Sequence, residues 1–267
     1  MRFYHRHAAL VRVTHWLNAG LFLLMLMSGL QIFNAHPALY LGNISDFDHP
    51  ILEIGARDHS SRGALVVFGH ALTTTGWLGL FPDASGGADV RAFPSWATLP
   101  GPQSLAEGRR LHFFFAFALL ANALIYWLFA LGSGHLWRDL LPSRAELVAL
   151  PRTAFDHLRL RFPRGAAAMH YNGLQQLTYL LVIAVLFPTL VLSGLTMSPR
   201  LDAQWPWLLE LFGGRQSARS VHFLMAFFLV GFVLVHLAMV LLSGVWNNLR
   251  SMITGRYAVA EENADAH

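Results

Sequence analysis

Four histidines stand within or at the ends of long apolar stretches of the chain: His15, His112, His222 and His236. Ionisable side chains are costly inside a membrane segment and are functional candidates by default. A neutral imidazole can offer one ring nitrogen as a ligand to haem iron or another metal. The alternative is that these histidines only cap helix ends or form hydrogen bonds with neighbours. A shared geometry among all four favours the ligand interpretation.

His222 and His236 are 14 residues apart. In an α-helix, 14 steps of about 100° place the second residue about 40° from the first, so the two share a face. The same 14 steps separate them by about 21 Å along the axis. One spanning helix would therefore carry a histidine near each membrane surface.

The helices that must position these residues are visible as stretches without Asp, Glu, Lys or Arg. A spanning helix needs about 20 mostly apolar residues, and the uncharged stretches are 13–45, 63–82, 111–137, 165–199 and 220–249. We expect spans near 13–33, 110–131, 173–196 and 220–243. The predicted fold class is all-α: an integral membrane four-helix bundle with a sizeable extracytoplasmic loop subdomain at 34–109. We expect residues 1–267 to form a single membrane domain.

The composition agrees with this class. Of 267 residues, 55% are hydrophobic and 13% are charged, against about 25% charged in a typical soluble protein. These values argue against a polar soluble enzyme, a disordered chain and a nucleic-acid-binding module. The sequence has no Cys, which excludes disulfides, Cys-held iron–sulfur clusters, thioether-attached haem and Cys-ligated zinc. Its 14 His favour haem or a metal held by imidazoles, or a proton path.

Four spans place both termini on the same side of the membrane. That side also holds the 132–172 loop and carries more of the arginines, so the positive-inside rule assigns it to the cytoplasm. His15 and His236 then lie on the inner side, and His112 and His222 on the outer side. Two imidazoles from facing helices are what a six-coordinate haem b requires. The arrangement predicts two haems, one near each membrane surface.

Gly29 lies 14 residues after His15 and shares its helix face, at the level of the outer haem. A flat macrocycle against a helix needs a residue without a side chain there, although ordinary small-residue helix packing explains Gly29 about as well.

The uncharged stretch 64–81 tests this pairing. If it crossed the membrane, His236 alone would lie outside and the pairs would fail, so we expect a strand or a surface-lying segment in an outer subdomain. No ligand spacing is recognisable among the loop histidines, and no metal is assigned to His36, His49, His59 or His70. The remaining histidines are expected at the surface: His5, His7, His135, His157, His170 and His267.

The stretch RVTHWLNAGLFLLMLMSGL, the histidine at the start of the second span and the 14-residue pair in the fourth resemble the membrane cytochrome b subunits of bacterial respiratory oxidoreductases. These include the γ subunit of formate dehydrogenase, the cytochrome b of nickel–iron hydrogenase and the thiosulfate reductase cytochrome b subunits. The last group looks closest, because of SGLQIFNAHPALYLG and FGGRQSARSVHF. The resemblance covers nearly the whole chain. It implies two haem b groups in the pairs derived above, and electron exchange between a quinone (menaquinone or ubiquinone) and a catalytic subunit.

The γ subunits also carry a Tyr-Asn-x-x-Gln stretch where span three enters from the cytoplasm. HYNGLQQL matches it with Tyr171, Asn172 and Gln175, which implies a quinone site beside the inner haem. The alternative is an ordinary polar cap at the membrane interface. Arg12 and Arg219 each stand three residues before a proposed ligand. Both are expected to pair with haem propionates, with interfacial snorkelling as the alternative.

We interpret the chain as an electron carrier, because it shows no nucleophile with a base and no phosphate-binding loop. The resemblance implies a bacterial inner-membrane protein with both termini cytoplasmic, and a periplasmic oxidoreductase partner of the molybdopterin type. Two alternatives stay open. One is a free-standing quinone-linked haem b oxidoreductase acting on a small diffusible reactant such as superoxide, and the other is a haem-free membrane anchor or transporter.

Overall fold

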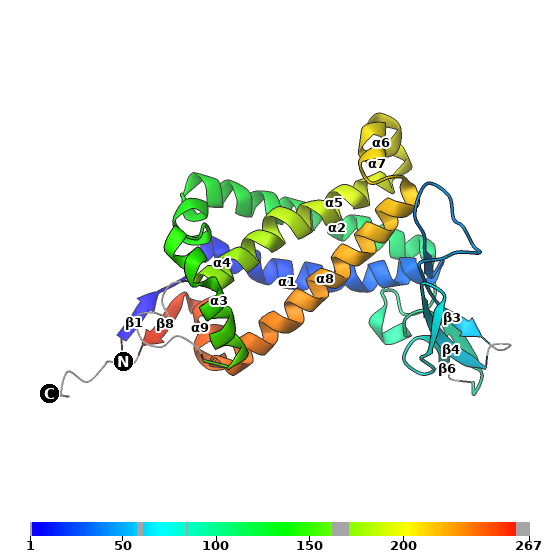
Figure 1. The fold of residues 1–267 in the computed structure, drawn as a ribbon, viewed down its shortest axis with the longest axis horizontal. Helices are drawn as coiled ribbons and strands as arrows, with labels where there is room; N and C mark the ends of the chain where they lie inside the picture. The colour runs from blue at the N-terminus through cyan, green and yellow to red at the C-terminus, as the bar shows by residue number, and fades with distance from the viewer. Residues whose placement is uncertain (1, 58–60, 84, 162–170, 260–267) are drawn as a thin grey trace. The chain divides into compact units, whose positions relative to one another are not determined.

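The computed structural model describes residues 2–57, 61–83, 85–161 and 171–259. Long helices dominate it (Figure 1). Four helical segments are long and apolar enough to cross a membrane: α1 (Ala9–Asn34), α2 (Leu105–Gly132), the segment Gly173–Thr196, and α8 (Arg215–Leu242). They confirm the four predicted spans. α1, α2 and α8 begin earlier than predicted, because the charged residues that bound each apolar window still lie within the helix.

The third spanning segment is not a uniform α-helix. It consists of α4 (Gly173–Leu180), a π-helical stretch η4 (Leu181–Leu186) and α5 (Phe187–Thr196). Pro188 follows the π-helical stretch directly. Its ring lacks an N–H and clashes with the carbonyl four residues earlier, which accounts for the local change in helix type.

The spanning helices turn large apolar side chains outward along their length. Only 6–17% of the most apolar window of each helix is buried. Exposed members include Leu23, Phe117, Leu128 and Leu234. A helix that is apolar on all faces is typical of a membrane span.

By contact density the chain divides into two compact units, and each spanning helix contributes residues to both. The first contains 1–18, 121–188 and 227–267, and the second contains 19–120 and 189–226. His15 and His236 belong to the first unit, whereas His112 and His222 belong to the second.

In the second unit, the chain between α1 and α2 forms β-strands. β2 (Ala38–Leu39), β3 (Leu52–Arg57), β4 (Arg62–Val67) and β5 (His70–Thr73) make an antiparallel sheet in that order. β6 (Gly79–Pro82) pairs with β7 (Ala88–Arg91). A 3₁₀ turn, η1 (Ser95–Ala97), follows. The segment 64–81 therefore forms strands, which confirms that it is not a spanning helix.

The strands pack against the end of α1 (Figure 1). The buried core there consists of Phe33, Leu39, Ile54, Ala92 and Phe93. Gly79 has φ +84°, and a Cβ at this position would collide with the carbonyl of Gly55, so β6 can cross β3 only with glycine there. Two short helices, α6 (Pro199–Gln204) and α7 (Pro206–Leu211), connect α5 to α8.

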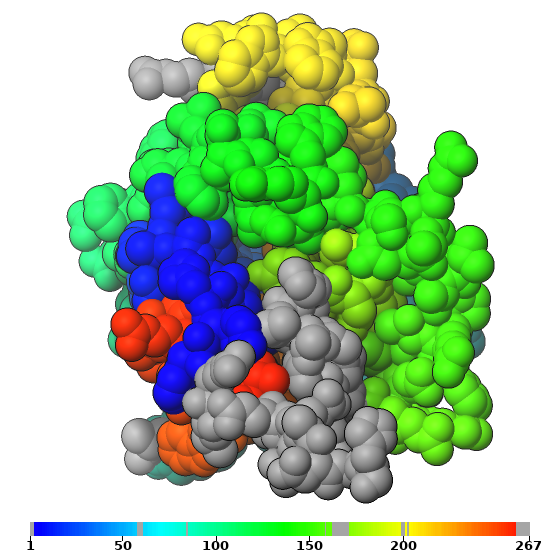
Figure 2. Space-filling view, turned by 90° about the vertical axis from the view of Figure 1, so that its left-hand side faces the viewer, coloured from blue at the N-terminus to red at the C-terminus, as the bar shows by residue number. Residues whose placement is uncertain are grey.

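In the first unit, β1 (Arg2–His5) pairs with β8 (Arg256–Val259), so the two ends of the described chain lie side by side (Figures 1 and 2). After α2 come a π-helical turn, η2 (Leu136–Leu140), and α3 (Arg144–Leu158). α9 (Val245–Thr254) follows α8. The core of this unit is Ala130, Leu136 and Leu140, surrounded by partly buried Tyr126, Trp127, Tyr171, Tyr179, Leu180 and Ile183.

Candidate functional site

His112 of α2 and His222 of α8 face each other in the second unit. Their ring centres are 6.2 Å apart and their planes are inclined at 70°. This is the pair predicted on the outer side of the membrane, and it is called the outer pair after that prediction.

His15 of α1 and His236 of α8 face each other in the first unit. Their ring centres are also 6.2 Å apart, with planes inclined at 63°. Trp16 packs edge-on against His15, and Phe232 stacks on His236. The structure thus brings together both histidine pairs that the helical spacing predicted.

The separation of the rings matches ligation of one metal ion between each pair. A ligating imidazole nitrogen lies about 2.0 Å from its metal and about 1.1 Å from its own ring centre, so two rings on opposite sides of one iron have centres about 6.2 Å apart. A direct hydrogen bond between the two rings would bring the centres closer. Both pairs therefore fit two axial ligands of a haem.

Hydrogen bonds orient the two outer imidazoles. Nδ1 of His222 lies 2.8 Å from the carbonyl oxygen of Leu190. The carbonyl can only accept, so Nδ1 carries the proton and Nε2 keeps its lone pair for a metal.

The other outer imidazole is held by a hydroxyl. Nδ1 of His112 lies 3.1 Å from Oγ of Ser28. The Ser28 hydroxyl donates to the Leu24 carbonyl at 2.7 Å, so its oxygen accepts from His112. Both outer rings are therefore oriented as metal-ligating histidines usually are.

A repeated Ser-Gly pair cradles these outer rings. A Cβ on Gly29 would lie 3.3 Å from Cε1 of His112, and a Cβ on Gly194 would lie 3.1 Å from Cε1 of His222. Ser193, next to Gly194, also reaches Nδ1 of His222 at 3.4 Å. Gly29 was predicted at this level, but here it packs against the histidine ring itself.

Ser28, Ser193 and Gly194 are site residues that were not predicted from the sequence. The signal was present, because Ser-Gly-Leu occurs at 28–30 and again at 193–195, in the spans that precede the two outer histidines.

Both predicted propionate partners donate to main-chain carbonyls. Arg12 donates to the Ile253 carbonyl, and Arg219 donates to the carbonyls of His36 and Ala38. These bonds show that each arginine ties its helix to a neighbouring segment. Nε of Arg12 and Nε2 of His36 are nevertheless buried polar atoms without a hydrogen-bond partner. The pairing with propionates stays a prediction.

Asn172 and Gln175 form a capping box at the start of α4. Oδ1 of Asn172 accepts from the main-chain N–H of Gln175 at 3.0 Å, and the main-chain N–H of Asn172 donates to Oε1 of Gln175 at 3.2 Å. The polar cap named as the alternative is therefore present. Nδ2 of Asn172 is not used by the cap and lies 3.5 Å from Nε2 of His157. A quinone contact from this group stays a prediction.

Tyr171 makes a contact that the sequence did not indicate. Its Oη lies 3.1 Å from Nδ1 of His7, and the two rings stack. His7 was expected at the surface, but it is only 8% exposed, and that expectation is wrong. The Tyr171 ring stacks on it, and Gly255 lies close to its main-chain carbonyl.

Burial and the charge of Arg6 lower the pKa of His7 from 6.5 to about 4, and His15 and His135 add to the shift. Burial raises the pKa of Tyr171. Both groups are thus uncharged near neutral pH, and the Tyr171 phenol donates to His7. His7 and Tyr171 therefore form a buried pair of protonatable groups. The two residues lie just before α1 and α4.

The other histidines follow the sequence expectations less uniformly. His5, His49 and His70 are exposed, whereas His135 is partly buried and lies 2.6 Å from Asp139. His36 is partly buried, and its burial and nearby Arg219 lower its pKa. His59, His170 and His267 lie outside the described residues. Within the described ranges, no group of three or more His, Asp or Glu could hold a metal ion.

Comparison with known proteins identifies a family and a relative. A model of the family described as prokaryotic cytochrome b561 matches residues 6–255. A protein of Azospira oryzae, named as a putative protein-methionine-sulfoxide reductase subunit YedZ1, is 33% identical over 252 residues, which cover 94% of this chain and 97% of that protein. The matches confirm the resemblance to membrane cytochrome b subunits that the histidine spacing indicated.

Proposed function

The chain belongs to the prokaryotic cytochrome b561 family, and on that premise we propose that it is a di-haem b cytochrome of a bacterial inner membrane. It carries electrons between the quinone pool and a catalytic oxidoreductase subunit. Family membership and the four apolar helices make it a membrane haem b electron-transfer protein. The number of haems, the quinone and the partner are the proposal.

One observation carries the di-haem assignment. Two separate histidine pairs have the same 6.2 Å between ring centres, and each pair joins α8 to a different helix. Each bound haem would take up and release one electron at its iron. The four histidines would supply nitrogen ligands to the haem irons, and Leu190 and Ser28 hold the rings of His222 and His112 in a suitable orientation. Arg12 and Arg219 are proposed to pair with the propionates, with His36 beside Arg219.

The quinone is proposed to react on the cytoplasmic side, next to the inner pair. Reduction of a quinone by two electrons also takes up two protons, so its site needs a proton donor. The Tyr171–His7 hydrogen bond would relay these protons from the cytoplasmic water, and the electrostatic effect of His15 on His7 supports its proximity to the inner pair. Nδ2 of Asn172 would donate to a quinone carbonyl, while Oδ1 caps α4.

The catalytic partner is proposed to bind the strand-containing part of the second unit from the periplasmic side. Exposed apolar side chains there support a protein contact, including Phe47, Phe68, Trp77 and Trp96. The related Azospira protein is named as a reductase subunit, which supports a reductase partner. The molybdopterin type of that partner, implied by the family resemblance, is part of the proposal.

The decisive experiment is haem quantification with reduced-minus-oxidised spectra of the purified chain. We expect two low-spin b haems per chain. His222→Ala should lose the outer haem and keep the inner one, and His15→Ala should do the reverse. His70→Ala, on exposed β5, is the matched control and should keep both. A chain that keeps both haems after His222→Ala would contradict the assignment.

A further inference from the structure

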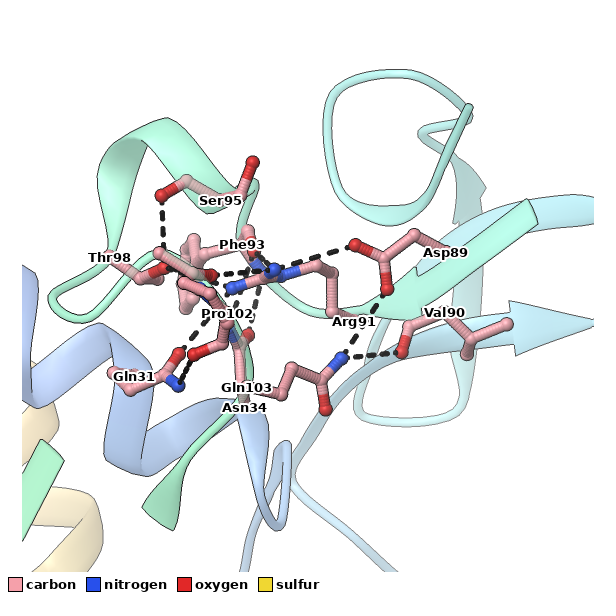
Figure 3. A network of polar contacts seen from close by, with 11 residues as sticks. Gln31, Asn34, Asp89, Val90, Arg91, Phe93, Ser95, Thr98, Pro102 and Gln103 are labelled. Atoms are coloured by element: carbon pink, nitrogen blue, oxygen red, sulfur yellow. Dashed lines mark hydrogen bonds and ion pairs between the residues drawn. The ribbon is translucent and has the colours of Figure 1, made fainter. Parts of the chain in front are cut away.

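Arg91, at the end of β7, is a buried arginine with only 4% of its surface exposed. Its Nε donates to the Phe93 carbonyl at 2.7 Å, and Nη1 donates to the Gly101 carbonyl at 3.1 Å. Nη2 donates to Oγ1 of Thr98 at 2.9 Å and lies 3.4 Å from Oε1 of Gln31 (Figure 3). The guanidinium is thus held by groups from the loop 93–102, which connects β7 to α2, and by Gln31 of α1.

The charge of Arg91 is poorly balanced. Among the described residues, its carboxylate partner is Asp89, whose Oδ2 is 3.4 Å from Nη1 and whose side chain is 35% exposed. The other acceptors are neutral. A charge away from water is screened less than one at the surface, so its field extends to groups nearby.

Gln31 links this charge to the outer histidine pair. Its side chain is 1% exposed, and its Nε2 donates to the Pro102 carbonyl at 2.7 Å. It lies three residues after Ser28, or about 4.5 Å along α1, and Ser28 holds Nδ1 of His112.

Contacts with α2 place Gln31 at the same height along the helices. A Cβ on Gly108 would lie 2.9 Å from Cγ of Gln31, and Gly108 stands one turn before His112 on α2. Gln31, which contacts Arg91, therefore lies about one helical turn from Ser28 along α1 and packs against α2 one turn before His112.

The loop is also fixed to α1 on both sides of Gln31. The Leu99 amide donates to the Met27 carbonyl at 3.1 Å. The Asn34 side chain bonds both the amide and the carbonyl of Phe93, at 2.8 and 3.3 Å. These bonds attach residues 93–99, which supply two of the acceptors of Arg91, to α1.

We infer that the buried charge of Arg91 raises the reduction potential of the haem held by His112 and His222. A positive charge in a poorly screened site stabilises the haem that has gained an electron over the one that has not. The inference rests on the proposed di-haem function. Arg91 would then help to set the reduction potential of the outer haem. The direction of the shift follows from the charge of Arg91 and needs no contact with the haem.

The test is spectroscopic redox titration of the purified chain, with the outer haem identified as the one lost in His222→Ala. Arg91→Gln should shift the outer midpoint to a more negative potential and leave the inner midpoint unchanged. Asp89→Asn removes the counter-charge and should shift the outer midpoint in the opposite direction. Arg91→Lys keeps the charge and should restore most of the wild-type value. Arg57→Gln, an exposed arginine of β3 paired with Glu53, is the control and should change neither midpoint.

Opposite shifts for Arg91→Gln and Asp89→Asn would support the inference. If both haems are present and the outer midpoint is unmoved in both variants, the inference is wrong and the di-haem function stands. If Arg91→Lys shifts the midpoint as far as Arg91→Gln, geometry rather than charge is responsible, which also overturns it. If Arg91→Gln fails to fold, the sign of the Asp89→Asn shift decides. A wild-type chain without a haem at His222 would overturn the proposed function, and this inference with it.

Discussion

Gly194→Ala is predicted to weaken haem binding at the outer pair. The added Cβ would lie 3.1 Å from Cε1 of His222 and 3.3 Å from its Nδ1. Carbon atoms in ordinary contact are about 3.5–4.0 Å apart, so the ring must recede by roughly 0.5 Å. It has little room to do so, because Nδ1 is bonded to Leu190 at 2.8 Å and Nε2 would be bonded to iron.

The size of the effect follows from overpacking. Extra carbon in a well-packed site typically costs about 1–3 kcal/mol. Since each 1.4 kcal/mol is about tenfold in an equilibrium constant, outer haem affinity should fall by a factor of about 5 to about 140. Gly29→Ala should have a smaller effect, because its Cβ would lie 3.3 Å from the ring of His112.

The assay is haem per chain and the low-spin difference spectrum during titration with haem. Gly20→Ala and Gly231→Ala are matched controls, because both positions lie in spanning helices and a Cβ there would meet nothing within 4 Å. They should be neutral or slightly stabilising, since alanine is favoured over glycine in a helix by up to about 1 kcal/mol. If Gly194→Ala binds outer haem as tightly as Gly20→Ala does, the glycine contact does not position His222 and the reasoning fails.

His7 is uncharged in the native chain, with a pKa lowered from 6.5 to about 4, so the unfolded chain binds more protons between these values. Stability should therefore fall as pH drops from 6.5 towards 4, by up to about 3 kcal/mol, and thermal unfolding of His7→Gln should show a smaller fall. Tyr171→Phe should slow haem reduction by a quinol analogue with both haems retained, and unchanged stopped-flow rates would place the quinone elsewhere. Asn172→Ala removes the α4 cap and should lower stability by about 1 kcal/mol, whereas Asn172→Ser should keep the cap. If both variants slow haem reduction by a quinol analogue equally, the effect on the quinone reaction is separate from capping. Ser85→Cys and Ser104→Cys should react with an impermeant thiol reagent on intact cells, and labelling only after lysis would contradict the proposed orientation.

The spans and the histidine pairs were predictable because both depend on local properties. A run of about 20 uncharged residues marks a spanning helix by itself, and the 14-residue spacing of His222 and His236 needs only helical periodicity. Their partners followed from the direction in which each helix crosses the membrane. The strand character of 64–81 was indicated indirectly, since a crossing there would have broken the pairing.

The residues that position the histidines were harder to predict from the sequence. Ser193 and Gly194 contact a histidine of a later helix, and nothing local distinguishes them from ordinary helix-packing residues except the repeated Ser-Gly-Leu. Asn172 and Gln175 were assigned to a quinone, whereas their spacing of three residues also specifies the capping box that the structure contains.

Composition, hydropathy and spacing by themselves determined a four-span helical membrane protein with two histidine pairs, because those features repeat along a single helix. Only the tertiary structure decided which polar groups are buried. His7 precedes a helix in an ordinary polar stretch, and it is buried against Tyr171, a residue 164 positions later in the chain. Arg91 sits in a short strand with no apolar window around it, and it becomes a buried charge beside α1 because residues 93–102 fold back onto Gln31 and Asn34. Burial depends on contacts between segments far apart in the sequence, which no local pattern records.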